Sequence, residues 1–344
     1  MSNKQQNDQS TSSFQWLYPL IVALIVASLS KVSITQFTTI DWQSSYNWGL
    51  YFSCYFLAVF AFKLRQNNSN KQVNTKHPSY SWPMPGMQGK LGLALKTVIF
   101  VVSNLLSLFN PFLFSQQLRL TFGMIGVSYR IKGHEEEIKH YQSKAHYRLP
   151  FNGEWLIYHG GDTPDKSHSW NVLNQRYAYD FVISDNTFKR HSGAGFHLRD
   201  YKCYGKDILS AADGEVIKVV NGVKDSPFVG WFFINAMSKQ AAGNHLIIKH
   251  EEGEFGFYAH LIKDSIPLKV GDKVKAGQFL GKCGFSGSTT EPHLHFHLQD
   301  GPSFYSAVGL PLKFENLAID GVRFDRSTIQ RGTVVNNVIE SVKA

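Results

Sequence analysis

Three histidines at alternate positions constrain this chain more than any other feature of its sequence. They are His293, His295 and His297, and each is followed by an apolar residue, Leu294, Phe296 or Leu298. In a β-strand, successive side chains point to opposite faces, so the imidazoles share one face and the apolar side chains share the other. The apolar face predicts packing on a core. Because imidazole binds metals and exchanges protons near neutral pH, the other face predicts a functional site.

Composition narrows the class of protein. The 344 residues include 43% hydrophobic and 14% aromatic residues, which predicts a folded chain with room for one large or two ordinary domains. The formal charge of +9 suits an anionic surface such as nucleic acid, anionic lipid or a wall polymer. The sequence contains no helix-turn-helix, CxxC-finger or RNP-like motif, so we expect no nucleic-acid partner.

The three cysteines do not form a disulfide framework. Cys54 lies in an apolar run, whereas Cys203 and Cys283 lie in the part that we expect to be soluble. A Cys203–Cys283 disulfide in an oxidising compartment and two unpaired, partly buried thiols are both compatible with this spacing.

The N-terminal third has the composition of a membrane anchor. Residues 1–13 are polar and predict a disordered tail. Residues 14–115 hold three apolar runs, and we expect an α-helical membrane region with two or three transmembrane helices. The first run, 14–29, is short, but Lys31 can extend it by snorkelling. A signal peptide is the alternative, which the single cation Lys4 before the run disfavours.

The second and third runs decide the topology. The second covers 48–62, and the acid-free basic segment 63–90 that follows it belongs in the cytoplasm by the positive-inside rule. The third, 91–114, is interrupted by Lys96, Asn104 and Asn110-Pro111, so an interfacial or buried helix is an alternative. Three spans place the rest of the chain outside, and two place it inside. We expect a cell-membrane protein with an extracytoplasmic C-terminal domain; core helices of a soluble domain are the alternative.

We interpret the charged segment 116–148 as a linker. The residue pattern of the sequence changes after it. From 149 to about 340, short β-rich pieces alternate with Gly, Asp and Asn turns, which predicts an all-β, partly barrel-like domain. The predicted strands are 154–158, 178–184, 214–220, 244–250, 255–260, 278–283 and 293–298, with possible closing strands at 310–315 and 333–335. The fourth and fifth form a hairpin that turns at 251–254.

Two further residues complete a candidate metal site. His260 ends one strand of the hairpin. Asp180 stands among apolar and aromatic neighbours on a predicted strand, where a carboxylate is costly unless it is paired or bound to a metal. A turn or cap role for Asp180 is the alternative.

Residues 150–300 resemble the M23 family of zinc metallopeptidases, the lysostaphin/LytM-like peptidoglycan endopeptidases. The matching stretches are Asp180, 211–216, 243–250, Tyr258-Ala-His-Leu261, 270–277, 284–287 and Pro292-His-Leu-His-Phe296. The resemblance implies a Zn²⁺ cofactor and a peptidoglycan or peptide substrate. It also implies that Asp180 and His295 are zinc ligands, and that His260 and His293 flank the reacting water.

One position departs from this pattern. The family's first ligand is a histidine four residues before the aspartate, and here that position is Arg176, which stays protonated and cannot bind zinc. Some M23-like sequences with Gln-Arg-Tyr-Ala-x-Asp carry a histidine upstream, which implies His168 as the first ligand. His159, His191 and His197 are rivals, and a metal-poor pseudoenzyme is a further alternative. His297 lies outside the family pair, as a partner of a ligand, a groove residue or a surface histidine.

Three functions follow from this combination. We expect a membrane-anchored zinc metallopeptidase, a hydrolase of the peptide cross-links of peptidoglycan. A non-catalytic M23-like module that binds wall polymer or regulates another hydrolase is the first alternative, because Arg176 occupies a ligand position. A zinc peptidase that acts on a protein or small peptide is the second.

Overall fold

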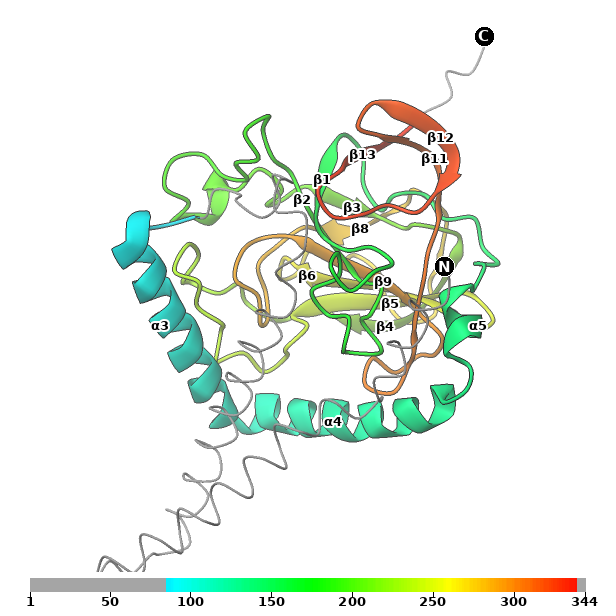
Figure 1. Cartoon of the computed structure of the whole chain (residues 1–344), viewed down its shortest axis with the longest axis horizontal. Coiled ribbons are helices and arrows are strands. Elements are labelled where there is room, and N and C mark those ends of the chain that lie inside the picture. The colour runs from blue at the N-terminus through cyan, green and yellow to red at the C-terminus, as the bar shows by residue number, and fades with distance from the viewer. Residues whose placement is uncertain (1–84, 339–344) are drawn as a thin grey trace, which may run out of the picture. The chain divides into compact units, whose positions relative to one another are not determined.

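The computed structural model describes residues 85–338. The predicted tail, the first two apolar runs, most of the basic segment and Cys54 lie outside the described residues. The described part begins with helices and continues as a β region (Figure 1).

The third apolar run forms a helix and the start of a second one. The helices are α3 (Gly89–Leu108), α4 (Pro111–Ile131) and the short α5 (Glu135–Lys139). Lys96 and Asn104 do not interrupt α3, whereas Asn110-Pro111 ends the run. Oδ1 of Asn110 accepts from the Phe112 N–H at 2.9 Å, and Pro111 occupies the first turn, where its missing N–H costs nothing.

Within the described residues, α3 is the one helix long and apolar enough to cross a membrane. Length and composition alone give this result, and a core helix or a signal sequence has the same properties.

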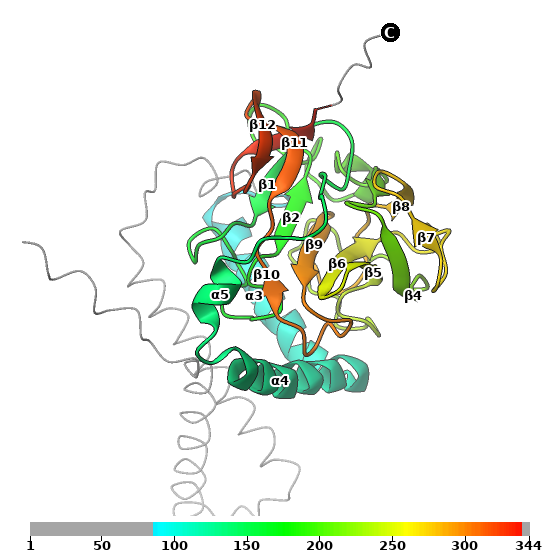
Figure 2. The same ribbon diagram turned by 90° about the vertical axis from the view of Figure 1, so that its right-hand side faces the viewer.

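Helix α4 packs against the β region and is hydrogen-bonded to it. Met124, Val127 and Ile131 form a small apolar cluster with Val308. At the other end, Nδ2 of Asn110 donates to the carbonyls of Ala236 and Ser238 at 2.9 and 2.8 Å. Figures 1 and 2 show α4 running along the lower side of the strands. The segment that we interpret as a linker from its sequence therefore includes residues of this packed helix.

The C-terminal region is mostly antiparallel β-sheet. The strands are β1 (Trp155–His159), β2 (Tyr179–Val182), β3 (Asp207–Leu209), β4 (Gly214–Val220), β5 (Asn244–Glu251), β6 (Glu254–Leu261), β7 (Lys273–Val274), β8 (Phe279–Lys282), β9 (Leu294–Gln299), β10 (Gly309–Leu310), β11 (Phe314–Ile319), β12 (Val322–Ser327) and β13 (Val334–Asn337). The main sheet has the order β12-β11-β13-β1-β2-β9-β6-β5-β4-β7, with β10 beside β9; β3 and β8 form a separate pair.

Each strand predicted between 154 and 298 is present. The hairpin is confirmed too, since Glu251 pairs with Glu254 across its turn. The sequence pattern did not predict β12, because this strand is mostly exposed and carries Arg323, Asp325 and Arg326 rather than an apolar alternation. Strands β12 and β7 lie at the two ends of the main sheet, and within the described residues no pairing between them closes the sheet into a ring.

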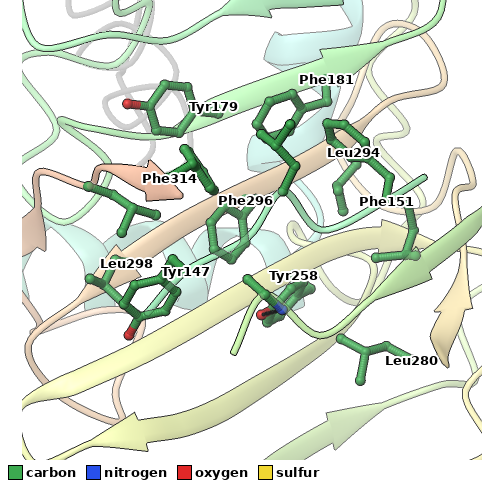
Figure 3. Close-up of a cluster of buried hydrophobic side chains, with 14 of the residues drawn as sticks. Tyr147, Phe151, Tyr179, Phe181, Tyr258, Leu280, Leu294, Phe296, Leu298 and Phe314 are labelled. Carbon is green, nitrogen blue, oxygen red and sulfur yellow. Dashed lines mark hydrogen bonds between the residues drawn. The ribbon is translucent and has the colours of Figure 1, made fainter. Parts of the chain in front are cut away.

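The core confirms the alternation in the histidine strand. Leu294, Phe296 and Leu298 of β9 are all buried in the main apolar cluster. Figure 3 shows them among aromatic side chains of neighbouring strands, including Phe181 and Phe314. Because these side chains fill the core side of β9, the histidines of this strand are placed on its opposite side.

The fold predicts acid sensitivity at a histidine away from the candidate site. His250 contacts the Asp213 carbonyl and the Tyr258 hydroxyl at 2.8 and 3.1 Å, and burial lowers its pKa to about 4. Between pH 6.5 and 4 the unfolded chain takes up a proton that folded His250 does not. Stability is therefore complete above pH 6.5 and falls by about 3 kcal/mol from this residue as the pH drops through that window.

Chemical unfolding of the purified chain at pH 7.5 and pH 4.5 checks this expectation. The His250→Gln variant, which cannot titrate there, should lose less stability on acidification than the unmodified chain. An equal loss in both proteins would contradict it.

Candidate metal centre

Four adjacent strands, in the order β1-β2-β9-β6, place the candidate residues side by side. In the β2–β9 pairing Asp180 lies opposite His295, and in the β1–β2 pairing His159 lies opposite Asp180. On the other side of β9, Ala259 of β6 pairs with His295, so His260 is the next residue along. Strand register therefore brings together residues up to 136 positions apart in the chain (159 to 295).

The closest group consists of Asp180, His293 and His295. One ligand atom from each residue lies within 4.8 Å of the other two. Nδ1 of His295 is 2.9 Å and Nε2 of His293 is 3.4 Å from Oδ1 of Asp180. Burial alone would raise the pKa of Asp180, but the charges of His168 and His293 and the close side-chain contacts with His293 and His295 hold it well below its ordinary value.

His168 approaches the second oxygen of the same carboxylate. Its Nδ1 lies 3.5 Å from Oδ2 of Asp180, and its side chain is 36% exposed. The ring of His168 is 4.8 Å from the ring of His159. Nδ1 of His159 is buried without a hydrogen-bond partner. His168 therefore contacts the carboxylate oxygen that His293 and His295 do not contact, and His159 lies beside His168.

Arg176 does not compete for this position. Its Nε donates to the Trp170 carbonyl at 3.1 Å, and its guanidinium lies 5.1 Å from the centre of the Trp170 ring. Two other rivals are engaged elsewhere: His191 forms a β-bridge with Tyr201, and His197 is an exposed residue before a 3₁₀ turn. Among the described contacts of Asp180, neither histidine appears.

His260 sits in a backbone conformation that few residues adopt. Its φ of 63° lies in the left-handed region, where a side chain is strained. Nδ1 of His260 donates to the Ser286 carbonyl at 2.8 Å, because a carbonyl can only accept. The other nitrogen, Nε2, then carries a lone pair. The Ser286 loop comes this close because a Cβ at Gly243 would collide with the Ser286 backbone.

His293 and His260 form a pair with opposite electrostatics. Their ring centres are 4.8 Å apart. Burial lowers the pKa of His293, but Asp180 and the Glu291 carbonyl, which is 2.9 Å from Nδ1, outweigh it and raise the pKa to about 9. Burial, followed by the charges of His293 and His295, holds the pKa of His260 well below its ordinary value. Such a separation suits one proton acceptor and one donor.

His297 is a buried partner of His295. Its Nδ1 lies 3.1 Å from Nε2 of His295, and its Nε2 lies 3.0 Å from Oε1 of Gln299. With 1% of its surface exposed, it is neither a surface residue nor open to a groove. Sequence reasoning missed Gln299, although the same period of two that singles out the histidines includes it.

The cysteines do not form a disulfide. Cys203 and Cys283 are both buried and free. Sγ of Cys203 lies 3.2 Å from the Pro292 carbonyl, immediately before His293. Of the two alternatives left open by the sequence, unpaired thiols are the one observed.

The donor set fits a zinc ion. Carboxylate and imidazole are the oxygen and nitrogen ligands that zinc uses, and three such ligands leave a fourth position for water. Nδ1 of His159, the strand partner of Asp180, is buried without a hydrogen-bond partner and is a further nitrogen next to this group. A buried carboxylate surrounded by imidazoles therefore suits a cation better than a structural ion pair alone.

A buried ion pair, missed in the sequence, holds the loop before His293. Nε of Arg190 donates to both oxygens of Glu291 at 3.0 and 3.1 Å, and both side chains are at least 95% buried. The guanidinium also lies 4.4 Å from the centre of the Tyr158 ring. Nothing near either residue in the sequence indicates this pairing across 101 positions.

We expect Glu291→Gln to destabilise the fold by about 3–5 kcal/mol, because it leaves the buried charge of Arg190 without its carboxylate. Chemical unfolding measures the loss. Glu252→Gln is the matched control, since Glu252 pairs with Lys249 while its side chain is 85% exposed, and it should change stability little. Equal effects of the two substitutions would rule out the proposed importance of the buried pair.

Part of the chain is similar to known peptidases. Residues 190–305 match the model of peptidase family M23; this range includes His260, His293 and His295 but begins after Asp180. The chain is 44% identical over 155 residues to the peptidoglycan DD-endopeptidase ShyA of Vibrio cholerae, covering 45% of this chain and 27% of ShyA.

A second relative is lysostaphin of Staphylococcus simulans, which is 31% identical over 154 residues, covering 44% of this chain and 27% of lysostaphin. The chain thus spans about a quarter of the length of each of these relatives. A solved structure of a zinc-containing peptidase from Vibrio cholerae is 25% identical, with a TM-score of 0.31, covering 48% of this chain and 39% of that one. The chain contains a domain of peptidase family M23.

Proposed function

We propose that this protein is a membrane-anchored zinc metallopeptidase that hydrolyses the peptide cross-links of peptidoglycan. The observation that carries the proposal is the position of Asp180, which contacts His295 and His293 through one oxygen and His168 through the other. His260 lies beside His293 without contacting the carboxylate in the described hydrogen bonds.

We assign His168, Asp180 and His295 as the zinc ligands. Nδ1 of His293 is already engaged by the Glu291 carbonyl, and its ring lies 4.8 Å from that of His260. His168 contacts Oδ2 of Asp180 and His295 contacts Oδ1, so these three residues would together hold the cation. His159 is then a neighbour of the ligand set, with its ring against that of His168.

The two remaining imidazoles perform the proton transfers. Zinc, when bound, lowers the pKa of a water molecule and polarises the scissile carbonyl. His260, with a lone pair on Nε2, accepts a proton from the water. His293, whose Nδ1 proton is held by the Glu291 carbonyl, presents Nε2–H to the developing oxyanion and then to the leaving amine.

The substrate class follows from the relatives and from charge. ShyA is named a peptidoglycan DD-endopeptidase, and the chain carries a formal charge of +9 that favours an anionic envelope. Cleavage of purified sacculi but not of unstructured peptides distinguishes this substrate from a soluble protein or peptide.

Exposed apolar side chains on the helices support membrane contact. On α3 they are Leu91, Leu93, Leu95, Val98, Val101, Val102 and Leu106; on α4 they are Phe112, Leu118, Phe122 and Tyr129. Surfaces of this kind are typical of helices that contact lipid or other helices. We therefore place the protein in the cell membrane with the peptidase domain, 149–340, outside the cytoplasm.

The ligand assignment predicts the metal content of the purified full-length chain. Elemental mass spectrometry should find about one zinc per chain. His168→Ala, Asp180→Ala and His295→Ala should each lose it, whereas the exposed-site control His197→Ala should retain it. Loss of zinc in His293→Ala with retention in His168→Ala would contradict the assignment and move the site to Asp180, His293 and His295.

The proton-transfer roles predict a different phenotype. His260→Ala and His293→Ala should retain zinc but hydrolyse sacculi about 10²–10⁴ times more slowly, because each removes a group that moves a proton. The exposed His140→Ala variant is the control and should remain active. Full activity of either His260→Ala or His293→Ala would refute the proposed mechanism, and wall binding without hydrolysis in the unmodified protein would favour a non-catalytic module.

A further inference from the structure

A line of buried polar side chains leaves the candidate metal site along β9. It joins Nε2 of His295 to Nδ1 of His297 at 3.1 Å, and Nε2 of His297 to Oε1 of Gln299 at 3.0 Å. The three residues are 5%, 1% and 0% exposed. Because each lies two positions after the last, all three side chains project from the same face of the strand.

The hydrogen bond at the end farthest from Asp180 determines which atom donates and which accepts in each of the other hydrogen bonds. Nε2 of Gln299 donates to the Gly301 carbonyl at 2.7 Å. A carbonyl oxygen can only accept, so the NH₂ group of Gln299 must face Gly301 and its oxygen must face His297. That oxygen also can only accept. Nε2 of His297 therefore carries a hydrogen.

The hydrogen on Nε2 of His297 in turn determines where His295 carries its hydrogen. With a hydrogen on Nε2, neutral His297 has its lone pair on Nδ1 and accepts from Nε2–H of His295. The lone pair of His295 then lies on Nδ1, which is 2.9 Å from Oδ1 of Asp180. Two acceptors at this separation repel each other, so a chain held in this arrangement favours a cation that lies against both.

We propose that His297 and Gln299 are positioning residues that fix the metal-binding tautomer of His295. This inference rests on the proposed function only in naming the cation as zinc. A hydrogen bond to the second nitrogen of a metal-binding histidine fixes its tautomer and ring orientation. Here a backbone carbonyl, Gly301, sets the tautomer from two side chains away.

If His295 and His297 are both neutral, the opposite order of donors and acceptors leaves two acceptors facing each other. If His295 held its hydrogen on Nδ1, it would donate to Asp180 and its Nε2 would need a hydrogen from His297. Nε2 of His297 would then be an acceptor facing the oxygen of Gln299, and turning that amide would set its oxygen against the Gly301 carbonyl. Either contact leaves a buried acceptor unsatisfied, which costs about 1–3 kcal/mol.

Phe257 supplies a matched pair of substitutions. Its ring stacks on His297 with centres 4.9 Å apart and planes at 23°, and on His245 with centres 5.2 Å apart and planes at 25°. His245 is also buried, but its Nδ1 is bonded to the Gly243 carbonyl and not to the metal site. His297→Phe and His245→Phe thus replace one stacked, buried imidazole each, and only the first breaks the line to His295.

The experiment measures zinc affinity of the purified full-length chain by competition with a chromophoric chelator. We expect His297→Phe to bind zinc about 10- to 100-fold more weakly than the unmodified chain, and His245→Phe to match the unmodified chain. His297→Gln should restore most of the affinity, because its amide can accept from His295 and donate to Gln299 in the same order. Thermal unfolding of each metal-free variant reports whether it is folded.

A second measurement reads the tautomer directly. ¹⁵N NMR of the metal-free chain, with His295 assigned through His295→Gln, should show hydrogen on Nε2 of His295, and His297→Phe should abolish this preference. Hydrogen on Nδ1 in the unmodified chain would overturn the inference, as would unchanged zinc affinity in His297→Phe or an equal loss in His245→Phe. If the unmodified chain binds no zinc, the proposed function fails, whereas the tautomer measurement still decides the inference.

Discussion

The buried contact between Asp180 and His295 is the interaction on which the rest of the site depends. A carboxylate that is 6% exposed is costly to bury, and here imidazoles approach both of its oxygens. The β2–β9 register sets this contact, because a slip of one strand by one residue would turn its member of the pair into the core. The apolar face of β9, with Phe296 at its centre, holds that register. Core packing and metal-site geometry are therefore two faces of one strand pairing.

Period-two alternation made much of this predictable from the sequence. Leu294, Phe296 and Leu298 had to share a face, and the core contains all three. The hairpin was predictable because two strand-like segments flank a short turn. Asp180 was predictable because a single charge among apolar strand residues is unusual. What the sequence could not provide were the long-range partners. Arg190 and Glu291 carry no local signal, and Gln299 resembles any polar strand residue until its neighbours in space are known.

The helices show how much of their structure an apolar run in the sequence can predict. The run 91–114 has several polar interruptions, but of these it is Asn110 and Pro111 that end one helix and start the next. Composition predicted that break, but it did not predict that α4 would be fastened to the β region through Asn110 and the Val308 cluster. Amphipathic packing of this kind depends on the surface that the helix meets, and a surface built by residues 235–308 is not visible in residues 111–131.

Backbone carbonyls fix the hydrogen positions of the imidazoles around Asp180. The Ser286 carbonyl holds the hydrogen of His260 on Nδ1, and the Glu291 carbonyl does the same for His293. For His295, Nδ1 faces the carboxylate, so a carbonyl there is impossible and the Gly301 carbonyl acts through Gln299 and His297 instead. The acceptors for His260 and His293 are backbone carbonyls, so substituting Ser286 or Glu291 does not remove them. Only the indirect one depends on side chains, which makes His295 the imidazole whose state substitution can most easily alter.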